Sequence, residues 1–516
     1  MQSVPLDIFS ALTEFGTKAD CLLLESGEPG TLKSEKSILI PTAALRIQVF
    51  GEKFIIEALS ANGIAFLSQF KSESCILEKQ SETLQIYTCP GYSEEFDLEH
   101  RLKAINVFSP LREMIEQLQP ADKSSAKAMM FSGLFGYDLV DLFEKLPDYK
   151  SQQKEQQEPY PDIYLIIPET LIVIDHLHHS LKIEQLVISG NDKEEELKRF
   201  NHASQQIAKL EQQIAQVTAT ETDAVDYIKN NDDDTIITLD CSDEDYVETV
   251  KQCKQYIRQG EVFQIVPSRK FSVSCTDTLA AYSRLSIQNP SPYQFYVSTE
   301  KFCLFGASPE SAVKYDSISR SVELYPIAGT VPRGRNKDGS LNLDLDNRLE
   351  CQLRLDTKEL AEHMMLVDLA RNDIARISET GTRRVAELLK VDRYSQVMHL
   401  VSRVEGILRK NLDLFHAFQA CLNMGTLTGS PKIRAMEILR ETELSRRDYY
   451  GGSVGYFDMD GNLDTAIIIR SAIVKNAIAE IRAGAGIVLD SNPETEARET
   501  RLKAGAVVKA ISGKSL

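Results

Sequence analysis

The chain contains 516 residues, of which 42% are hydrophobic and 26% charged, a composition typical of a soluble globular protein. At roughly 100–200 residues per domain, this length predicts two to four domains. The formal net charge of −18 repels nucleic acid and anionic membrane surfaces, so neither is an expected partner. An anionic ligand would therefore have to be held by a few basic side chains in a local pocket.

The nine cysteines are scattered, and no two of them form a Cys-x-x-Cys pair. This pattern argues against a disulfide framework or a zinc site and favours a reducing compartment. The beginning of the chain lacks the basic and apolar segments of a secretory signal, and no run reaches the ~18–20 apolar residues of a membrane span. We therefore expect a cytoplasmic protein.

The first part of the chain is predicted to be rich in β-strands. Short apolar runs bounded by Gly, Pro and Ser indicate strands, and they lie at 21–25, 37–41 and 54–58. A longer β-rich run covers 164–175, in which Pro168 indicates a bulge or an edge position. The Gln- and Glu-rich stretch 149–159 is expected to be an exposed loop.

A helix and a linker are predicted to follow. Over 192–214 apolar residues recur at helical spacing, which indicates an amphipathic helix. These residues are Leu197, Phe200, Ile207, Leu210 and Ile214. The polar and acidic stretch 216–235 is interpreted as a linker between two domains, 1–215 and 236–516.

The second part of the chain mixes helices and strands. Ser242 and Asp245 form a capping-box pattern that predicts a helix reaching residue 257, with Gly260 as its stop. The other predicted elements are strands at 262–266, 464–472 and 478–488 and a helix at 493–511. Together the elements predict an α+β fold with much antiparallel sheet.

Two Glu-x-x-Glu pairs are candidates for a metal site. Residues three apart share one face of a helix, and two such pairs facing each other would need a cation to offset their repulsion. Magnesium accepts carboxylate oxygens together with anionic oxygens of a substrate. The residues are Glu359, Glu362, Glu496 and Glu499. The same spacing occurs at Glu25 and Glu28, and most such pairs are solvated helix faces, so spacing alone leaves both interpretations open.

Several basic or glycine-rich positions are candidates for anion binding. Arg470 ends the apolar run AIIIR, where a buried charge needs a partner such as a carboxylate. Lys503 follows Glu499 by one helical turn, although this position also suits a surface lysine. The backbone of 484–486, Gly-Ala-Gly, could approach an anion or allow tight strand packing. The stretch 326–330 predicts a glycine turn with a hydroxyl group nearby.

His399 lies in a β-like apolar run, YSQVMHLVSRVEG. A lone histidine in such a run is more often a hydrogen-bonded core residue than a catalyst. Its ionisation near neutral pH nevertheless leaves a role as general acid or base open.

Taken in order, these motifs closely resemble those of anthranilate synthase component I, in the chorismate-utilising enzyme family. The resemblance covers nearly all of 240–505 and extends to LLLES (22–26) and GLFGYDLV (133–140). Its segments include NPSPYQFY (289–296), FGASPES (305–311), YPIAGTVPRG (325–334), VDRYSQVMHLVSRVEG (391–406), MGTLTGSPKIRAMEIL (424–439), DTAIIIRSA (464–472) and AGAGIVLDSNPETEARET (483–500). It implies antiparallel sheets that form a sandwich with helices packed outside, a regulatory and scaffold domain at 1–215 and a catalytic domain at 236–516.

The resemblance also implies a site. Glu359, Glu362, Glu496 and Glu499 would surround Mg²⁺, with Glu362 and Glu499 as the firmest ligands. His399 would assist departure of the 4-hydroxyl of chorismate, and Gln264 and Thr426 are further catalytic candidates. The residues expected to hold chorismate are Gly329, Thr330, Tyr450, Arg470, Gly484, Ala485, Gly486 and Lys503.

Two positions select the reaction within this family. Relatives that add water at C2 resemble one another in having a lysine base where this chain has Gln264, and aminodeoxychorismate synthases have a nucleophilic lysine in place of Ala328. Glutamine cannot deprotonate water and alanine has no nucleophile, so ammonia addition at C2 is expected, followed by loss of the 4-hydroxyl and of pyruvate. An enzyme that stops at 2-amino-2-deoxyisochorismate, or a tryptophan-binding homologue without catalysis, remains an alternative.

The source of ammonia and the regulation are also implied by the resemblance. No Gly-x-Cys-x-Gly element is present, so a separate glutamine amidotransferase subunit is expected, in a heterotetramer of two large and two small subunits. Feedback inhibition by L-tryptophan is expected as well. Its implied residues are Glu25, Ser26, Lys36, Asn289, Pro292, Tyr293 and Gln294. Relatives often have methionine at position 294, which puts the strength of inhibition in question.

Overall fold

The computed structural model describes residues 4–26, 36–91, 97–120, 129–149, 158–190, 192–219, 236–394, 397–514 and 516. Its helices are α1 (Val4–Leu12), α2 (Ala61–Leu67), α3 (Leu98–Lys103), α4 (Ser109–Gln117), α5 (Lys193–Ala219), α6 (Asp243–Arg258), α7 (Thr278–Gln288), α8 (Leu343–Leu355), α9 (Thr357–Ala375), α10 (Leu414–Cys421), α11 (Lys432–Thr442) and α12 (Pro493–Ser512), with short 3₁₀ helices η2 (Tyr137–Leu142) and η3 (Gly425–Leu427). None of the helices in these ranges is long and apolar enough to cross a membrane.

The strands of the first part are β1 (Cys21–Glu25), β2 (Lys36–Phe50), β3 (Lys53–Ala58), β4 (Ile76–Gln80), β5 (Leu84–Thr88), β6 (Met130–Phe135), β7 (Ile163–Asp175) and β8 (Ser180–Gln185). Those of the second part are β9 (Thr238–Leu239), β10 (Gln264–Ile265), β11 (Ser268–Ser274), β12 (Tyr293–Ser298), β13 (Cys303–Ser308), β14 (Ser311–Asp316), β15 (Ser321–Leu324), β16 (Ile327–Pro332), β17 (Arg384–Arg393), β18 (Val397–Ile407), β19 (Gly429–Ser430), β20 (Ser453–Asp458), β21 (Leu463–Ile467), β22 (Ser471–Lys475) and β23 (Ile478–Gly484).

Antiparallel pairing joins strands from both parts of the chain into one sheet. β1 lies between β2 and β12, and β20 lies between β6 and β21. Residues before and after the predicted linker therefore share hydrogen-bonded ladders. Of that linker, 216–219 continue α5, and 220–235 lie outside the described residues. The division into 1–215 and 236–516 stays a prediction.

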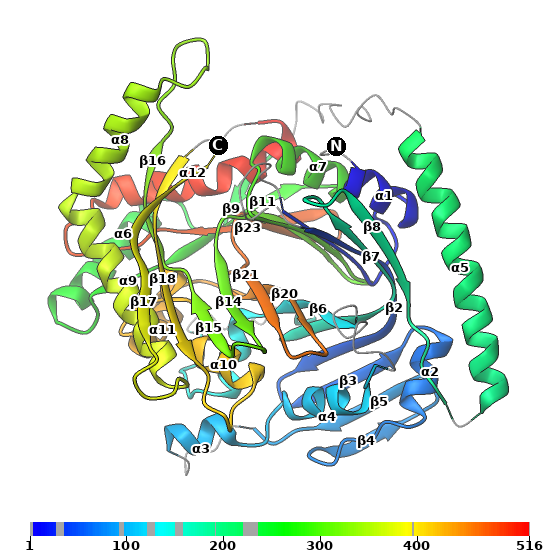
Figure 1. Ribbon diagram of the computed structural model, residues 1–516. Helices are drawn as coiled ribbons and strands as arrows, with labels where there is room; N and C mark the ends of the chain where they lie inside the picture. The colour runs from blue at the N-terminus through cyan, green and yellow to red at the C-terminus, as the bar shows by residue number, and fades with distance from the viewer. Residues whose placement is uncertain are drawn as a thin grey trace.

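The sheet folds over onto itself around a core of apolar side chains. Leu22, Phe295 and Leu304 pack in one cluster with Leu134 of β6 and Ile166 of β7. Helices cover the outside: α1, α7 and α12 pack over strands at one end, α5 runs along one edge, and α8 and α9 lie on the other side (Figure 1). The predicted α+β sandwich with external helices is confirmed.

Several local predictions are confirmed. The strand at 21–25 is β1, and the long strand at 164–175 is β7, whose register on β2 shifts at Pro168 as expected of a bulge. Gly260 ends α6 with a φ of +79°, in the left-handed region that suits a helix stop. Of the predicted loop 149–159, residues 150–157 lie outside the described residues.

Other local predictions are wrong. The strand predicted over 464–472 is two strands, β21 and β22, because the chain turns at Arg470, whose φ is +51°. The strand at 262–266 shrinks to β10, and that at 478–488 ends at Gly484. The helix predicted at 192–214 is confirmed as α5, and Leu210 and Ile214 are buried as expected, but Leu197 and Phe200 are 57% and 58% exposed, so only the second half of the predicted apolar face is buried.

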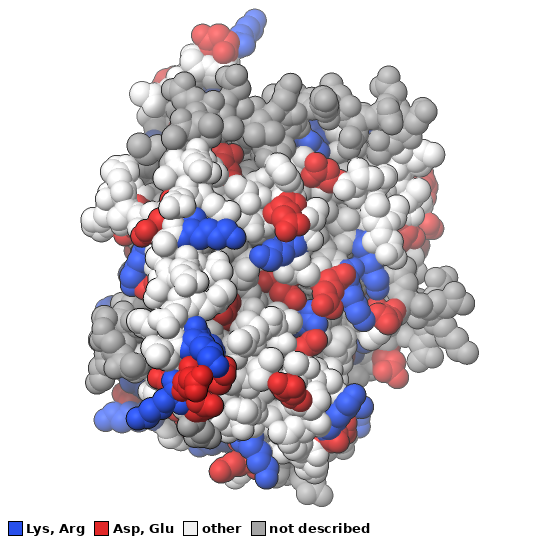
Figure 2. Space-filling view, turned by 90° about the vertical axis from the view of Figure 1, so that its right-hand side faces the viewer, with Lys and Arg blue, Asp and Glu red and all other residues white. Residues whose placement is uncertain are grey.

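On the surface shown in Figure 2, the basic side chains of the described residues are scattered among acidic ones and form no basic patch. Nucleic acids bind mainly through contacts of Lys and Arg with phosphates. The face shown therefore offers no extended surface for such contacts.

A buried ion pair joins three loops in the second part of the chain. The Arg447 guanidinium donates to the Glu443 carboxylate at 2.6 Å and also to the backbone oxygens of Leu427 and Val266. Ser268 donates to the same carboxylate from its N–H and hydroxyl. Burial opposes ionisation of Glu443, but the charge of Arg447 holds its pKa below the ordinary value.

Removing one member of this pair leaves a buried charge without its counterion. Arg447→Met is therefore expected to lower the free energy of unfolding by about 3–5 kcal/mol, measured by urea unfolding. The double variant Glu443→Gln/Arg447→Met should be less destabilised than Arg447→Met alone. A single variant within about 1 kcal/mol of wild type would contradict this account of the pair.

Candidate active site

Helices α9 and α12 bring the two Glu-x-x-Glu pairs to one place. Glu359 and Glu362 lie in the first two turns of α9, and Glu496 and Glu499 in the first two turns of α12. Burial, and then the charges of Glu359 and Glu499, raise the pKa of Glu362 to about 7. Burial, and in part the charge of Glu499, raise the pKa of Glu359 as well. The pairs therefore act on each other electrostatically, as expected of carboxylates facing a common space.

The chemistry of these four carboxylates suits a hard divalent cation. Burial raises the pKa of Glu496, with Glu499 adding to the effect, and only Glu499 has its pKa lowered, because Lys503 offsets the effect of burial. Within the described ranges, however, no three such side chains already stand in the geometry of a metal site. Magnesium keeps waters and takes few protein ligands, so uncompensated carboxylates without a closed cage suit it.

Gln264 contacts one of these carboxylates directly. Its Nε2 donates to Oε1 of Glu362 at 3.0 Å. In the described part of the chain its buried Oε1 has no hydrogen-bond partner. A Cβ at Gly486 would lie 2.7 Å from Gln264 Nε2 and 3.3 Å from Glu362 Oε1. The 484–486 backbone thus approaches the site closely, and a side chain at 486 would displace Gln264.

Basic and hydroxyl groups form the adjoining wall. Lys503 Nζ donates to the Gly484 oxygen at 3.0 Å and pairs with Glu499 at 2.7 Å, so it is not a free surface lysine. Arg470 Nη1 donates to the Lys503 oxygen at 3.2 Å, and burial lowers its pKa. A Cβ at Gly484 would lie 3.2 Å from the Tyr450 hydroxyl. The predicted chorismate-holding residues of this wall therefore lie together.

Strands β16 and β18 supply the histidine side of the site. Thr330 lies opposite His399, and its Oγ1 is 2.9 Å from His399 Nδ1. Gly329 has a φ of +72° at an irregularity in the β16 register, and a Cβ there would lie 3.1 Å from Glu359 Oε2. The turn predicted at 326–330 is thus a bulge within a strand. His399 is half-buried and hydrogen-bonded to Thr330, so its role as a general acid or base stays a prediction.

Glu310 is a site residue that the sequence analysis missed. It joins β13 and β14, is 8% exposed, and lies beside Thr426 in a small cavity that also includes Leu366 of α9. Burial raises its pKa to about 8, although Thr426 and Lys503 act in the opposite direction. The sequence contains a signal for this residue, because in FGASPES (305–311) a carboxylate lies between two strands that are buried.

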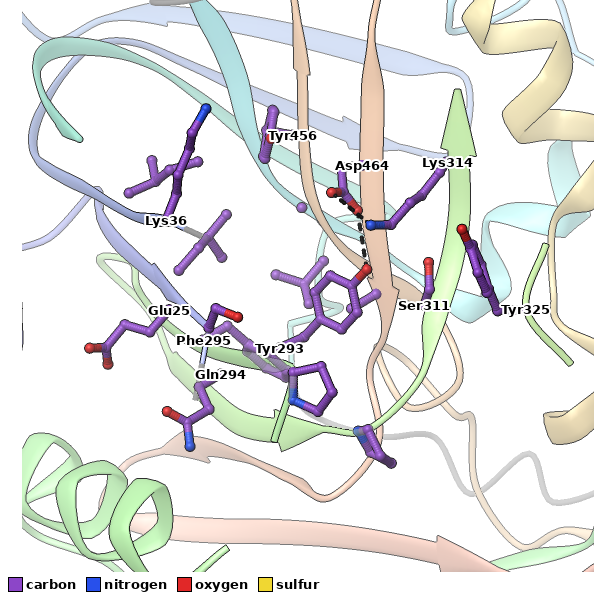
Figure 3. A pocket seen from close by; sticks show the side chains of 18 of the residues that line it. Glu25, Lys36, Tyr293, Gln294, Phe295, Ser311, Lys314, Tyr325, Tyr456 and Asp464 are labelled. Atoms are coloured by element: carbon purple, nitrogen blue, oxygen red, sulfur yellow. Dashed lines mark hydrogen bonds and ion pairs between the residues drawn. The ribbon is translucent and has the colours of Figure 1, made fainter. Parts of the chain in front are cut away.

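The residues expected to bind tryptophan lie around a separate cavity of about 320 Å³, here called the inhibitor cavity (Figure 3). Of the predicted set, Glu25, Ser26, Lys36, Pro292, Tyr293 and Gln294 line it. Asn289 does not; it ends α7 nearby. The four clustered glutamates do not line it either. Burial raises the pKa of Glu25 to about 7, and Tyr282 donates a 2.5 Å hydrogen bond to it.

Comparison with known proteins identifies the class of enzyme. The family model described as chorismate binding enzyme matches residues 73–509, which include the carboxylate pairs and all the residues expected to hold chorismate. The structure also resembles that of MenF, the menaquinone-specific isochorismate synthase of Escherichia coli, with a TM-score of 0.64 at 15% identity, over 97% of this chain and 91% of that one. That likeness concerns the fold alone.

Relatives of higher sequence identity define the kind of enzyme within this family. Anthranilate synthase component 1 of Buchnera aphidicola subsp. Baizongia pistaciae is 46% identical over 99% of this chain and 95% of its own length, and that of Escherichia coli is 46% identical over 96% and 93%. The crystal structure of component I from Streptococcus pneumoniae gives a TM-score of 0.66 at 27% identity, over 92% and 93%. The chain belongs to the chorismate-binding enzyme family, and within it to the component I enzymes of anthranilate synthase.

Glu310 is expected to act as a proton donor, because its buried carboxyl keeps its proton at neutral pH. Glu310→Gln keeps the shape but cannot give a proton, so turnover should fall about 10²-fold or more. In wild type, turnover at a fixed concentration of free ammonia should decline as pH rises through about 8, since the acid form is then lost. An unchanged turnover in Glu310→Gln, with thermal unfolding like wild type, would exclude this role.

Proposed function

We propose that this chain is the large subunit of an anthranilate synthase that converts chorismate and ammonia to anthranilate and pyruvate. The observation that carries the proposal is the contact between Gln264 and Glu362, because it puts an amide, and not a base, beside the carboxylates. An amide cannot deprotonate water, which disfavours hydration at C2. Ala328 offers no amine for covalent attack either. Ammonia is left as the nucleophile that adds at C2.

Chorismate is a dianion, and the site offers a cationic partner for each of its carboxylates. We assign the ring carboxylate to Mg²⁺ held by Glu362 and Glu499, with Glu359 and Glu496 around it. When bound, magnesium supplies positive charge that offsets both the glutamates and the substrate. The other carboxylate and the hydroxyl fall to the side chains of Arg470, Lys503, Tyr450 and Thr330 and to the backbone of Gly329, Gly484, Ala485 and Gly486.

Two acid–base groups are available for the bonds that break. Glu310 retains its proton at neutral pH, so we assign it the protonation of the departing 4-hydroxyl, with Thr426 beside it. The product of this step is 2-amino-2-deoxyisochorismate. Aromatisation then requires loss of the C2 proton together with pyruvate. We assign the removal of that proton to His399, whose ring Thr330 orients through Nδ1. This role replaces the one in 4-hydroxyl departure that the resemblance implies.

Ammonia is proposed to come from a second subunit. The name component 1 of the similar proteins implies a component 2, and we infer a glutamine amidotransferase subunit in a heterotetramer of two large and two small subunits. The complex would act in the cytoplasm, in the first step of tryptophan biosynthesis. A purified large subunit should then still use ammonium salt directly.

The inhibitor cavity is proposed to bind L-tryptophan. Glu25 and Lys36 lie at one end of it (Figure 3), and Ser26 also lines it. A carboxylate and a hydroxyl can hold the ammonium group of an amino acid, and Lys36 can hold its carboxylate. Tyr293 and Pro292 provide apolar surface for the indole ring. Feedback inhibition through this cavity would match the place of the reaction in the pathway.

The proposed reaction is tested with purified chain, chorismate, Mg²⁺ and ammonium salt at high pH. Fluorescent anthranilate and pyruvate are expected in equal amounts, and Glu362→Ala should reduce both at least about 10²-fold, because it removes a metal ligand and the Gln264 contact. His399→Gln is expected to accumulate 2-amino-2-deoxyisochorismate. Formation of that compound without pyruvate by wild type would instead assign the chain as a 2-amino-2-deoxyisochorismate synthase. No amination at all would refute the proposal.

Tryptophan binding can be followed by the fluorescence of the ligand itself, because the chain contains no tryptophan. Lys36→Met should weaken binding about tenfold, since it removes a charged hydrogen bond to the ligand carboxylate. Lys53→Met is the matched control: Lys53 begins β3 and does not line the cavity. Equal affinities for the two variants would show that Lys36 does not contact the ligand.

A further inference from the structure

Cys75 and Cys89 face each other at one end of the hairpin formed by β4 and β5. Ile76 of β4 pairs with Thr88 of β5; Cys75 precedes the first of these residues, and Cys89 follows the second. The same register therefore places the two cysteines opposite each other. Opposed residues of antiparallel strands point to the same face, with Cα atoms about 4.5–5.5 Å apart. Disulfide bonds span about 4.4–6.8 Å between Cα atoms, so this pair of positions can accommodate one.

Hydrogen bonds hold the backbone on both sides of the pair. Next to Cys75, the N–H group of Ser74 donates to Glu113 Oε1 at 2.9 Å. Across from it, the N–H group of Cys89 donates to the backbone oxygen of Glu52 at 2.9 Å. The two thiols are therefore held in place by the surrounding fold, and they can react with each other without a rearrangement of the backbone.

The two thiols are in contact and almost closed to solvent. Their Sγ atoms are within hydrogen-bond distance, at 2.6 Å, and Cys75 and Cys89 are 8% and 0% exposed. They pack in the same apolar core as Phe70 and Tyr87. All nine cysteines are free thiols in this structure, so the pair is a dithiol. Its burial excludes bulky thiol reagents, and the small opening at Cys75 suits a small oxidant.

The two sulfur atoms differ in reactivity. The hydrogen bond with Cys89 lowers the pKa of the Cys75 thiol, whereas the same contact, together with burial, raises the pKa of the Cys89 thiol. The thiolate is the form that attacks an oxidant. Cys75 is both the more exposed and the more acidic of the two, so it reacts first, and Cys89 is the thiol beside it that can react with the product.

We propose that Cys75 and Cys89 form a site of reversible oxidation, at which hydrogen peroxide converts the two thiols into an intrachain disulfide. This site is separate from the residues assigned to chorismate and from the inhibitor cavity, and the proposal does not depend on the proposed function. The strand register and the contact between the two buried thiols carry it.

The reaction has two steps. The Cys75 thiolate attacks one oxygen of the peroxide, the O–O bond breaks, and the other oxygen leaves as hydroxide, which takes up the former thiol proton to give water. Cys75 is then a sulfenic acid. The Cys89 sulfur attacks the Cys75 sulfur, the S–O bond breaks, and the hydroxyl group leaves with the Cys89 proton as a second water. Two electrons pass from the two sulfurs to the peroxide oxygens.

The test treats the reduced full-length chain with a small molar excess of hydrogen peroxide. Remaining thiols are then alkylated under denaturing conditions, and the cysteines are mapped by mass spectrometry. Most chains should contain a disulfide between Cys75 and Cys89, and dithiothreitol should restore both thiols. Cys421 should stay reduced, because burial raises its pKa to about 12. The oxidised chain should unfold at a temperature about 2 °C or more above that of the reduced chain, since the cross-link restricts the unfolded state.

Three serine variants separate the roles of the thiols. Cys89→Ser lacks the second thiol, so dimedone should label the sulfenic acid at Cys75, whereas Cys75→Ser should show no label at Cys89. Cys351→Ser is the matched control: it removes an exposed cysteine and should form the disulfide as wild type does. Thermal unfolding of the reduced variants checks that each one folds.

The proposal is overturned if peroxide oxidises the exposed Cys351 of wild type while Cys75 and Cys89 both remain thiols. It is also overturned if Cys75 is found linked to another cysteine or only in intermolecular disulfides. A label at Cys89 in Cys75→Ser, without a label at Cys75 in Cys89→Ser, would refute the assigned order of attack. If either variant fails to fold, the map of wild type decides by itself.

Discussion

The buried pair between Glu443 and Arg447 is the interaction on which the candidate site depends. Arg447 binds the backbone oxygens of Val266 and Leu427, and the pair is only 1% and 0% exposed. Gln264 precedes the first of these oxygens by two residues, Thr426 precedes the second by one, and Tyr450 follows Arg447 by three. Because a buried charge is costly unless it is paired and hydrogen-bonded, this one pair fixes three loops that carry site residues.

The site that this ion pair holds in place combines charged groups with groups that stay neutral. Carboxylates on α9 and α12 create a negative field suited to a cation, and Lys503 and Arg470 supply positive charge beside Glu499. Gln264, Ala328 and protonated Glu310 carry no charge at neutral pH. In the proposed reaction, the charged groups bind the dianionic substrate. The neutral groups determine which nucleophile adds and which bond breaks, since ionisable groups at 264 or 328 would open competing reactions.

The sequence predicts α12, the helix that carries Glu496 and Glu499, because helical spacing is a local property. Through the resemblance, it also predicts six of the residues that line the inhibitor cavity. It does not predict the break at Arg470 or the bulge at Gly329, since both depend on the partner strand. Glu310 escapes notice for a related reason: a glutamate in a motif of small residues gains its raised pKa only when the strands around it bury the carboxyl.

By itself, then, the sequence determined what each group can do chemically: four carboxylates for a cation, an amide where relatives have a base, and no amine at 328. Only the tertiary structure decided which groups meet. Strand pairing across distant parts of the chain places Glu25 of β1 opposite Gln294 of β12. It also places Ser311 in the wall of both cavities. Those contacts join residues hundreds of positions apart, and they arise because burying apolar strands against one another fixes every register in the sandwich at once.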